Sequence, residues 1–106
     1  MNRHANINTT QIGTNSPLLI IAGPCVLESE NEAMHIAETL CEYCADAGLP
    51  FVFKGSFDKA NRTSVHSKRG PGMQKGLDIL AHVKETLGVP VTTDIHEASH
   101  AKPVSE

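Results

Sequence analysis

The stretch PLLIIAGP, Pro17–Pro24, decides the fold class, because it sets an unbroken apolar run between residues that interrupt regular structure. The run extends from Leu18 to Ala22, which is the length of a strand. Unbroken apolar runs are typical of strands that are covered on both faces, as the strands of parallel sheets are. The stretch therefore predicts a buried strand in a parallel sheet.

A helix is predicted directly after this strand. Ser29 is followed three residues later by Glu32, which is the spacing of a capping box at a helix start. Apolar residues then recur at helical spacing until Gly48, and a glycine is typical of the position just past a helix end. The apolar stripe consists of Ala33, Ile36, Ala37, Leu40, Cys41 and Cys44.

The chain then repeats this order. Phe51–Phe53 and the stretch VPVTTD, Val89–Asp94, predict two more strands, with a second helix between them that ends at Gly88. Such alternation implies parallel strands joined by crossover helices. A short hairpin is expected in Ala5–Asn15, ahead of the first strand, and a further helix after Asp94. The second helix has the apolar stripe Met73, Leu77, Leu80, Val83 and Leu87.

Length and composition narrow the class of protein. At 106 residues the sequence is at most one domain, and 40% hydrophobic with 20% charged residues is ordinary for a soluble globular protein. A net charge of −3 argues against nucleic acid or an anionic membrane as partner. No apolar run approaches the ~18 residues of a membrane span, and the polar start does not resemble a signal peptide. With three cysteines, the sequence predicts reduced thiols in the cytoplasm.

Basic residues gather in one stretch, KGSFDKANRTSVHSKRGPG, Lys54–Gly72, which holds five of the nine Lys and Arg residues and one acid. Arginine binds phosphate through two parallel hydrogen bonds, and lysine supplies a point charge. The stretch suits a small ligand with several negative charges, and a solvated loop is the alternative. RNA is less suitable, because Phe57 is the only aromatic residue available for stacking.

A chemically active side chain follows or ends each predicted strand. Cys25 comes just after the first, Lys54 ends the second, and Asp94 ends the third. Ligands of parallel α/β proteins bind at the carboxyl ends of the strands, where the loops converge. We expect these three side chains at one edge of the sheet, as a binding site or as ordinary loop residues.

Two short motifs match known sites in letters only. CEYC, Cys41–Cys44, has the redox spacing C-x-x-C, but it lies mid-helix near the apolar stripe, so packing cysteines are favoured. HEASH, His96–His100, matches the zinc-protease motif H-E-x-x-H, which needs an established helix. Because the match begins two residues after a strand and ends three before Pro103, a protease is disfavoured.

Three stretches together resemble the 3-deoxy-D-manno-octulosonate 8-phosphate synthase family. They are IAGPCVLES, Ile21–Ser29; FKGSFDKANRTSVHSKRGPG, Phe53–Gly72; and TTDIHE, Thr92–Glu97. The resemblance covers Leu18–Val104. The first stretch is shared with the related 3-deoxy-D-arabino-heptulosonate 7-phosphate synthases, whereas the second is specific to the octulosonate enzymes.

The resemblance implies a fold and a reaction. Family members are (β/α)8 barrels that condense phosphoenolpyruvate with D-arabinose 5-phosphate in lipopolysaccharide sugar biosynthesis, and a homo-oligomer, a tetramer, is implied for the whole enzyme. A barrel takes ~250 residues and eight strands. Residues 1–106 would therefore form part of one domain, with the N-terminal three strands of a barrel after a short hairpin, and this part alone is expected to be inactive.

The resemblance also assigns roles at the phosphoenolpyruvate end of the site. Lys54, Ser56 and Lys59 would face this substrate. Lys54, Lys59 and Asp94 are the expected catalytic residues. Two phosphates and a carboxylate would then explain why cations gather after the second strand.

The remaining roles concern the sugar and a metal. Asn61 would bind sugar hydroxyls, Arg62 and Thr63 would bind the sugar phosphate, and Asp94 would lie near the sugar. Cysteine at position 25 marks the metal-dependent class of the family, so Cys25 would be one ligand of a divalent metal, with a His, a Glu and an Asp on later strands.

Two departures and two alternatives accompany the resemblance. Gly55 stands where the family usually has Ser or Ala, and His100 where it usually has Gln. The alternatives are an enzyme like the heptulosonate synthases and a truncated, non-catalytic α/β remnant that binds phosphate.

Overall fold

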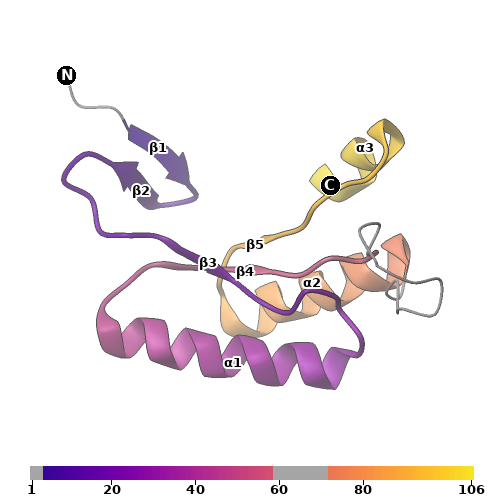
Figure 1. Cartoon of the computed structure of the whole chain (residues 1–106), viewed down its shortest axis with the longest axis horizontal. Helices are drawn as coiled ribbons and strands as arrows, with labels where there is room; N and C mark the ends of the chain where they lie inside the picture. Colours follow the sequence, from indigo (N-terminus) through magenta and orange to yellow (C-terminus); the bar gives the residue numbers. More distant parts are fainter. Residues whose placement is uncertain (1–3, 59–71) are drawn as a thin grey trace.

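The computed structural model describes residues 4–58 and 72–106 of the chain. The elements form a hairpin, a three-stranded sheet with two long helices, and a short helical end (Figure 1). In chain order they are β1 (His4–Ile7), β2 (Thr10–Gly13), β3 (Ile20–Ala22), α1 (Glu30–Ala47), β4 (Phe51–Lys54), α2 (Met73–Leu87), β5 (Val91–Thr92), the 3₁₀ turn η1 (Ala98–His100) and α3 (Ala101–Ser105).

The predicted hairpin is confirmed. β1 pairs antiparallel with β2, from His4 opposite Gly13 to Ile7 opposite Thr10. The turn places Asn8 at φ 53°, a left-handed conformation that asparagine tolerates better than most residues.

The three-stranded sheet is parallel throughout, as the sequence predicts. Its strand order is β3-β4-β5, so neighbours in the sheet follow one another in the chain. Pairing begins where the Ile20 amide donates to the carbonyl of Pro50, with Ile20 opposite Phe51. The first strand is consequently shorter than the predicted Leu18–Ala22.

α1 forms where its capping signals predict it. The Ser29 hydroxyl accepts a hydrogen bond from the Glu32 amide at 3.1 Å, which satisfies one of the free N–H groups of the first turn. At the other end Gly48 adopts φ 71° and its N–H bonds to the carbonyl groups of the last turn. Both ends are therefore set by residues within or next to the helix.

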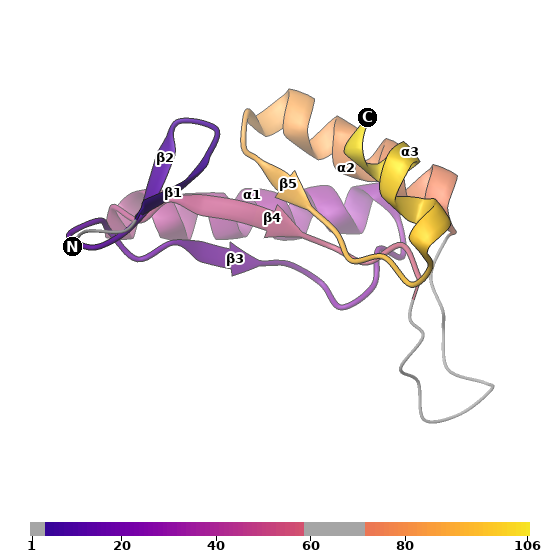
Figure 2. The ribbon, with the colours of Figure 1, turned by 90° about the horizontal axis from the view of Figure 1, so that it is seen from above.

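α1 and α2 cover the same face of the sheet (Figure 2). The core lies between them and β4, with Phe53, Leu27 and Val83 as its largest fully buried side chains. Cys44 belongs to this core and Cys41 packs against it, as the packing interpretation of CEYC predicts. Because both helices share a face, neither of them covers the opposite face of the sheet.

The prediction that the first strand is covered on both faces is wrong for this chain. Ile21 of β3 is 51% exposed and Leu18, just before it, is 71% exposed. β3 lies at the edge of the sheet, and both long helices pack on one side only. The apolar run thus has a face for which residues 4–58 and 72–106 supply no cover.

The end of the chain is helical, as expected, but only briefly so. η1 leads directly into α3, whose five residues have no buried member.

Within the part of the chain that the structure describes, no helix has the length and apolarity that crossing a bilayer demands.

Candidate active site

The carboxyl ends of β3 and β4 are in direct contact, as the parallel sheet predicts. A Cβ atom at Gly23 would lie 1.7 Å from the carbonyl oxygen of Lys54, so only glycine fits at this position. Lys54 is the last residue of β4, and Asp94 follows the end of β5 by two residues. The same edge of the sheet therefore carries a cation and a carboxylate.

Backbone hydrogen bonds hold the chain as it leaves β4. The Gly55 amide donates to the Thr92 carbonyl at 3.3 Å, and the Leu27 amide donates to the Ser56 carbonyl at 2.9 Å. The Gly72 amide, at the start of α2, donates to the Phe57 carbonyl at 3.0 Å. The residues that follow Lys54 are thus fixed to β5, to the segment after β3 and to α2.

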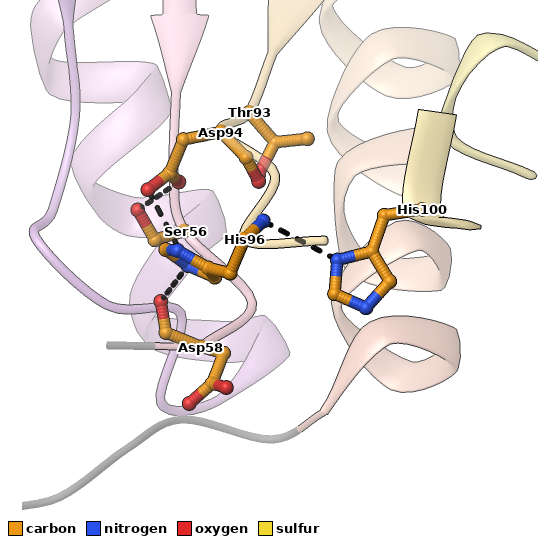
Figure 3. Close-up of polar contacts among 6 residues, drawn as sticks. All are labelled: Ser56, Asp58, Thr93, Asp94, His96 and His100. Carbon is orange, nitrogen blue, oxygen red and sulfur yellow. Dashed lines mark hydrogen bonds and ion pairs between the residues drawn. The ribbon is translucent and has the colours of Figure 1, made fainter. Parts of the chain in front are cut away.

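Ser56 and Asp94 are joined by their side chains. The Ser56 hydroxyl donates to Oδ1 of Asp94 at 2.5 Å, and Ser56 is only 6% exposed (Figure 3). Burial by itself would raise the pKa of Asp94, but the Ser56 hydroxyl, the backbone and the positive charges of Lys54 and His96 outweigh it. The net pKa lies below the ordinary carboxyl value, so Asp94 is an anion at neutral pH.

His96 joins the segment after β5 to the segment after β4. Its Nε2 lies 2.9 Å from the carbonyl oxygen of Asp58 and 3.5 Å from Oδ2 of Asp94. A carbonyl oxygen only accepts hydrogen bonds, so Nε2 carries a proton and donates it to Asp58. One imidazole therefore contacts both strand-end segments (Figure 3).

Phe57 is buried next to the two histidine rings and is 2% exposed. The rings of His96 and His100 meet it edge-on, with centroids 6.1 and 5.3 Å away. On the side of α2, a Cβ at Gly76 would lie 2.3 Å from the Cβ of Phe57. The ring is thus held between α2 and the two histidines.

The HEASH segment, His96–His100, does not adopt the geometry of a zinc-protease site. The motif runs through η1 rather than an α-helix, and Nδ1 of His100 accepts the backbone N–H of His96 at 3.3 Å. Since Nε2 of His96 binds a carbonyl oxygen, the two rings do not converge on one point as metal ligands would.

Cys25 lies three residues past β3 and is exposed. Among residues 4–58 and 72–106, no three His, Cys, Asp or Glu side chains lie close enough to hold a metal ion. An exposed thiol at this edge of the sheet is a suitable donor, but the described residues offer it no companion ligands.

The structure brings together three of the predicted site residues, Lys54, Ser56 and Asp94. The other predicted substrate-binding residues lie outside the described residues; they are Lys59, Asn61, Arg62 and Thr63. No role in this site was predicted for His96 or His100 from the sequence, although His96 belongs to the TTDIHE stretch and His100 departs from the usual Gln of the family. The position of His96, two residues after Asp94 at a strand end, was the available signal.

The arrangement can bind an anion next to an ordered carboxylate. Lys54 supplies the charge, and Asp94 is held by Ser56 in one orientation with its charged form favoured. A fixed carboxylate can accept hydrogen bonds from hydroxyl groups of a ligand whose phosphate or carboxylate pairs with the cation.

Comparison with known proteins gives one family. The family model described as the DAHP synthetase I family matches residues 3–106. Relatives that carry the name 2-dehydro-3-deoxyphosphooctonate aldolase include proteins from Geobacter sulfurreducens and Cupriavidus taiwanensis. The relative from Geobacter sulfurreducens is 51% identical over 106 residues, which is 100% of this chain and 39% of that protein. The relative from Cupriavidus taiwanensis is 55% identical over 95 residues, which is 90% of this chain and 33% of that protein.

These matches differ in what they cover. The chain spans 39% of the length of the first relatives that it matches, so their names describe proteins more than twice as long. The family model, by contrast, extends over nearly every residue of the chain. This chain belongs to the DAHP synthetase I family.

Proposed function

We propose that this chain forms the first part of a 3-deoxy-8-phosphooctulonate synthase, the enzyme also called 2-dehydro-3-deoxyphosphooctonate aldolase. The observation that carries the proposal is the edge where Lys54, Ser56 and Asp94 meet. Relatives that bear this name are about half identical to the chain over its full length. The substrates of the proposed synthase are phosphoenolpyruvate and D-arabinose 5-phosphate, and its product enters lipopolysaccharide sugar synthesis.

The sheet is the first arc of a (β/α)8 barrel in this proposal. Parallel strands in chain order with helices on one face are what such an arc requires. The uncovered side of β3, with Ile21 half exposed, then faces the interior of the barrel. The carboxyl ends of the strands form the catalytic face, which agrees with the position of the site.

The chemistry joins two anions. A bond forms between C3 of phosphoenolpyruvate and the aldehyde carbon of the sugar, whose oxygen takes up a proton. Water adds to C2 and gives up a proton. Phosphate leaves as the bond between C2 and the phosphate ester oxygen breaks. Holding two like-charged substrates in one orientation is the main task of the protein, because bringing them together lowers the barrier by several kcal/mol.

The residues divide this task between the two substrates. Lys54, Ser56 and Lys59 face phosphoenolpyruvate, and Lys54 and Lys59 offset the charge that its phosphate and carboxylate bring into the site. Asp94 lies near the sugar, held by the Ser56 hydroxyl. Asn61, Arg62 and Thr63 bind the sugar hydroxyls and the sugar phosphate.

Cys25 is one ligand of a divalent metal in this proposal, and the other ligands come from later strands of the barrel. A thiolate binds such metals readily, and the exposed position past β3 leaves room for ligands from other strands. The metal would supply a Lewis acid at the reacting carbonyl group. The whole enzyme is proposed to act in the cytoplasm as a homo-oligomer, a tetramer.

The test uses a fusion of all 106 residues of this chain to the part of the Geobacter sulfurreducens relative that follows the match. We expect the fusion to consume phosphoenolpyruvate and release phosphate when arabinose 5-phosphate is added. A preference for a four-carbon sugar phosphate, which a seven-carbon product requires, would instead support the heptulosonate synthase. No reaction with either sugar would support the non-catalytic remnant.

A further inference from the structure

His100 is the outermost member of the group of side chains around Phe57. Its side chain is 19% exposed, and its ring stands edge-on to Phe57 at 5.3 Å. Nδ1 accepts the backbone N–H of His96 at 3.3 Å. An acceptor nitrogen carries no proton, so the ring proton of neutral His100 is on Nε2, which faces Oε2 of Glu97 at 4.0 Å.

His96 depends on this contact for its position. Its Nε2 donates to the Asp58 carbonyl and lies 3.5 Å from the Asp94 carboxylate, and its backbone N–H donates to Nδ1 of His100. The segment between β5 and η1 contains no regular structure that would fix His96 otherwise. The His96 backbone is therefore held by His100, while its ring lies against the Asp58 carbonyl, the Asp94 carboxylate and the Phe57 ring.

We propose that His100 is a positioning residue of the active site, which holds His96 and through it the Asp94 carboxylate. The role rests on the proposed function, since Asp94 is the group assigned to the sugar substrate. His100 itself touches no substrate in this proposal. It acts by offering an acceptor atom at the right place, so a side chain with another acceptor of similar reach can replace it.

The test compares His100→Ala with His100→Gln in the fusion. Gln places a carbonyl oxygen where it can accept the His96 N–H, whereas Ala has no acceptor. A single hydrogen bond corresponds to about a two- to tenfold change in an equilibrium constant. We expect His100→Ala to raise the KM for arabinose 5-phosphate about five- to tenfold and the KM for phosphoenolpyruvate less than about twofold. His100→Gln should stay within about twofold of the parent for both.

His82→Ala is the matched control. His82 lies on α2, half exposed, and its contact is Glu30 at 3.7 Å, so this variant should keep the parent values. Equal increases in both KM values for His100→Ala would contradict a role at the sugar end. A His100→Gln variant that fails as His100→Ala does would show that the acceptor atom is not what matters.

Hydrogen exchange of the His96 amide provides a readout that does not depend on turnover. Mass spectrometry of the peptide that contains His96 should show exchange about five- to tenfold faster in His100→Ala and near-parent exchange in His100→Gln. Unchanged exchange in His100→Ala would overturn the proposal. A fusion that consumes neither substrate would refute the proposed function, and the exchange rates would still decide whether His100 holds His96.

Discussion

Replacing Gly23 by alanine should force the ends of β3 and β4 apart. The added Cβ would lie 1.7 Å from the Lys54 carbonyl oxygen and 2.7 Å from its carbon, whereas real Cβ contacts stay beyond 3.0 Å. The strands must therefore separate by more than 1 Å, at a point where the next residue pair of the ladder is Ala22 and Phe53. The clashing atoms are backbone, so no side-chain rotation relieves the contact.

The magnitude follows from two terms. Overpacking a tight contact costs about 1–3 kcal/mol, and loss of one ladder hydrogen bond adds about 0.5–1.5 kcal/mol. We expect Gly23→Ala to lower the free energy of unfolding by about 2–4 kcal/mol. It should also weaken phosphoenolpyruvate binding, because Lys54 moves with the strand end.

The assay is urea unfolding of the fusion, with Gly48→Ala as the matched control. A Cβ at Gly48 would have no neighbouring atom within 4 Å, but Gly48 adopts φ 71°, so alanine there suffers conformational strain of about 1 kcal/mol without a clash. The loss for Gly23→Ala must exceed the loss for Gly48→Ala. If it does not, the close contact between β3 and β4 is not what requires glycine.

Three further predictions concern the metal, the acid range and the isolated chain. Cys25→Ala should abolish metal binding and turnover of the fusion, and Cys25→Asn should keep some activity that chelator does not affect; a fully active, metal-free parent fusion would end the metal proposal. Because the pKa of Asp94 is lower in the folded state, its contribution to stability is present above the unfolded value of about 3.9 and is lost as pH falls through the folded value. Unfolding of Asp94→Asn should therefore depend less on pH below about 4 than unfolding of the parent, and identical slopes would contradict this. The 106-residue chain by itself should aggregate or lack a cooperative transition, since Leu18 and Ile21 are exposed; a sharp thermal transition in a monodisperse monomer would refute this.

The secondary structure could be predicted from sequence because its determinants are local. Ser29 caps α1 through a residue three positions away, and Gly48 and Gly88 end their helices through their own backbone conformation. Parallel pairing followed from the alternation of strands and helices. Exposure of β3 is not a local property, because it depends on which other segments pack against Ile21; it is expected from the number of strands and helices that the chain supplies.

The site was predictable only in outline. The rule that parallel strands end at one edge correctly placed Lys54 near Asp94. The rule could not predict individual hydrogen-bond partners. Ser56 binds Asp94, and Asp58 binds His96, across 38 positions of the chain. The hydrogen bond from the His96 amide to His100 is local. It was not predicted, because HEASH was compared with a metal-binding motif at these positions.

The most direct test of the account is equilibrium binding of phosphoenolpyruvate to the fusion, measured by calorimetry for the parent and two lysine variants. Lys54→Gln removes the cation at the carboxyl end of β4, and Lys84→Gln removes one in the last turn of α2, at the opposite end of that helix from Gly72. If the edge binds this anion, Lys54→Gln should weaken binding by about tenfold or more, as expected for a charge-assisted hydrogen bond, and Lys84→Gln should leave it unchanged. Equal affinities for the parent and Lys54→Gln would contradict the claim that this edge holds the substrate.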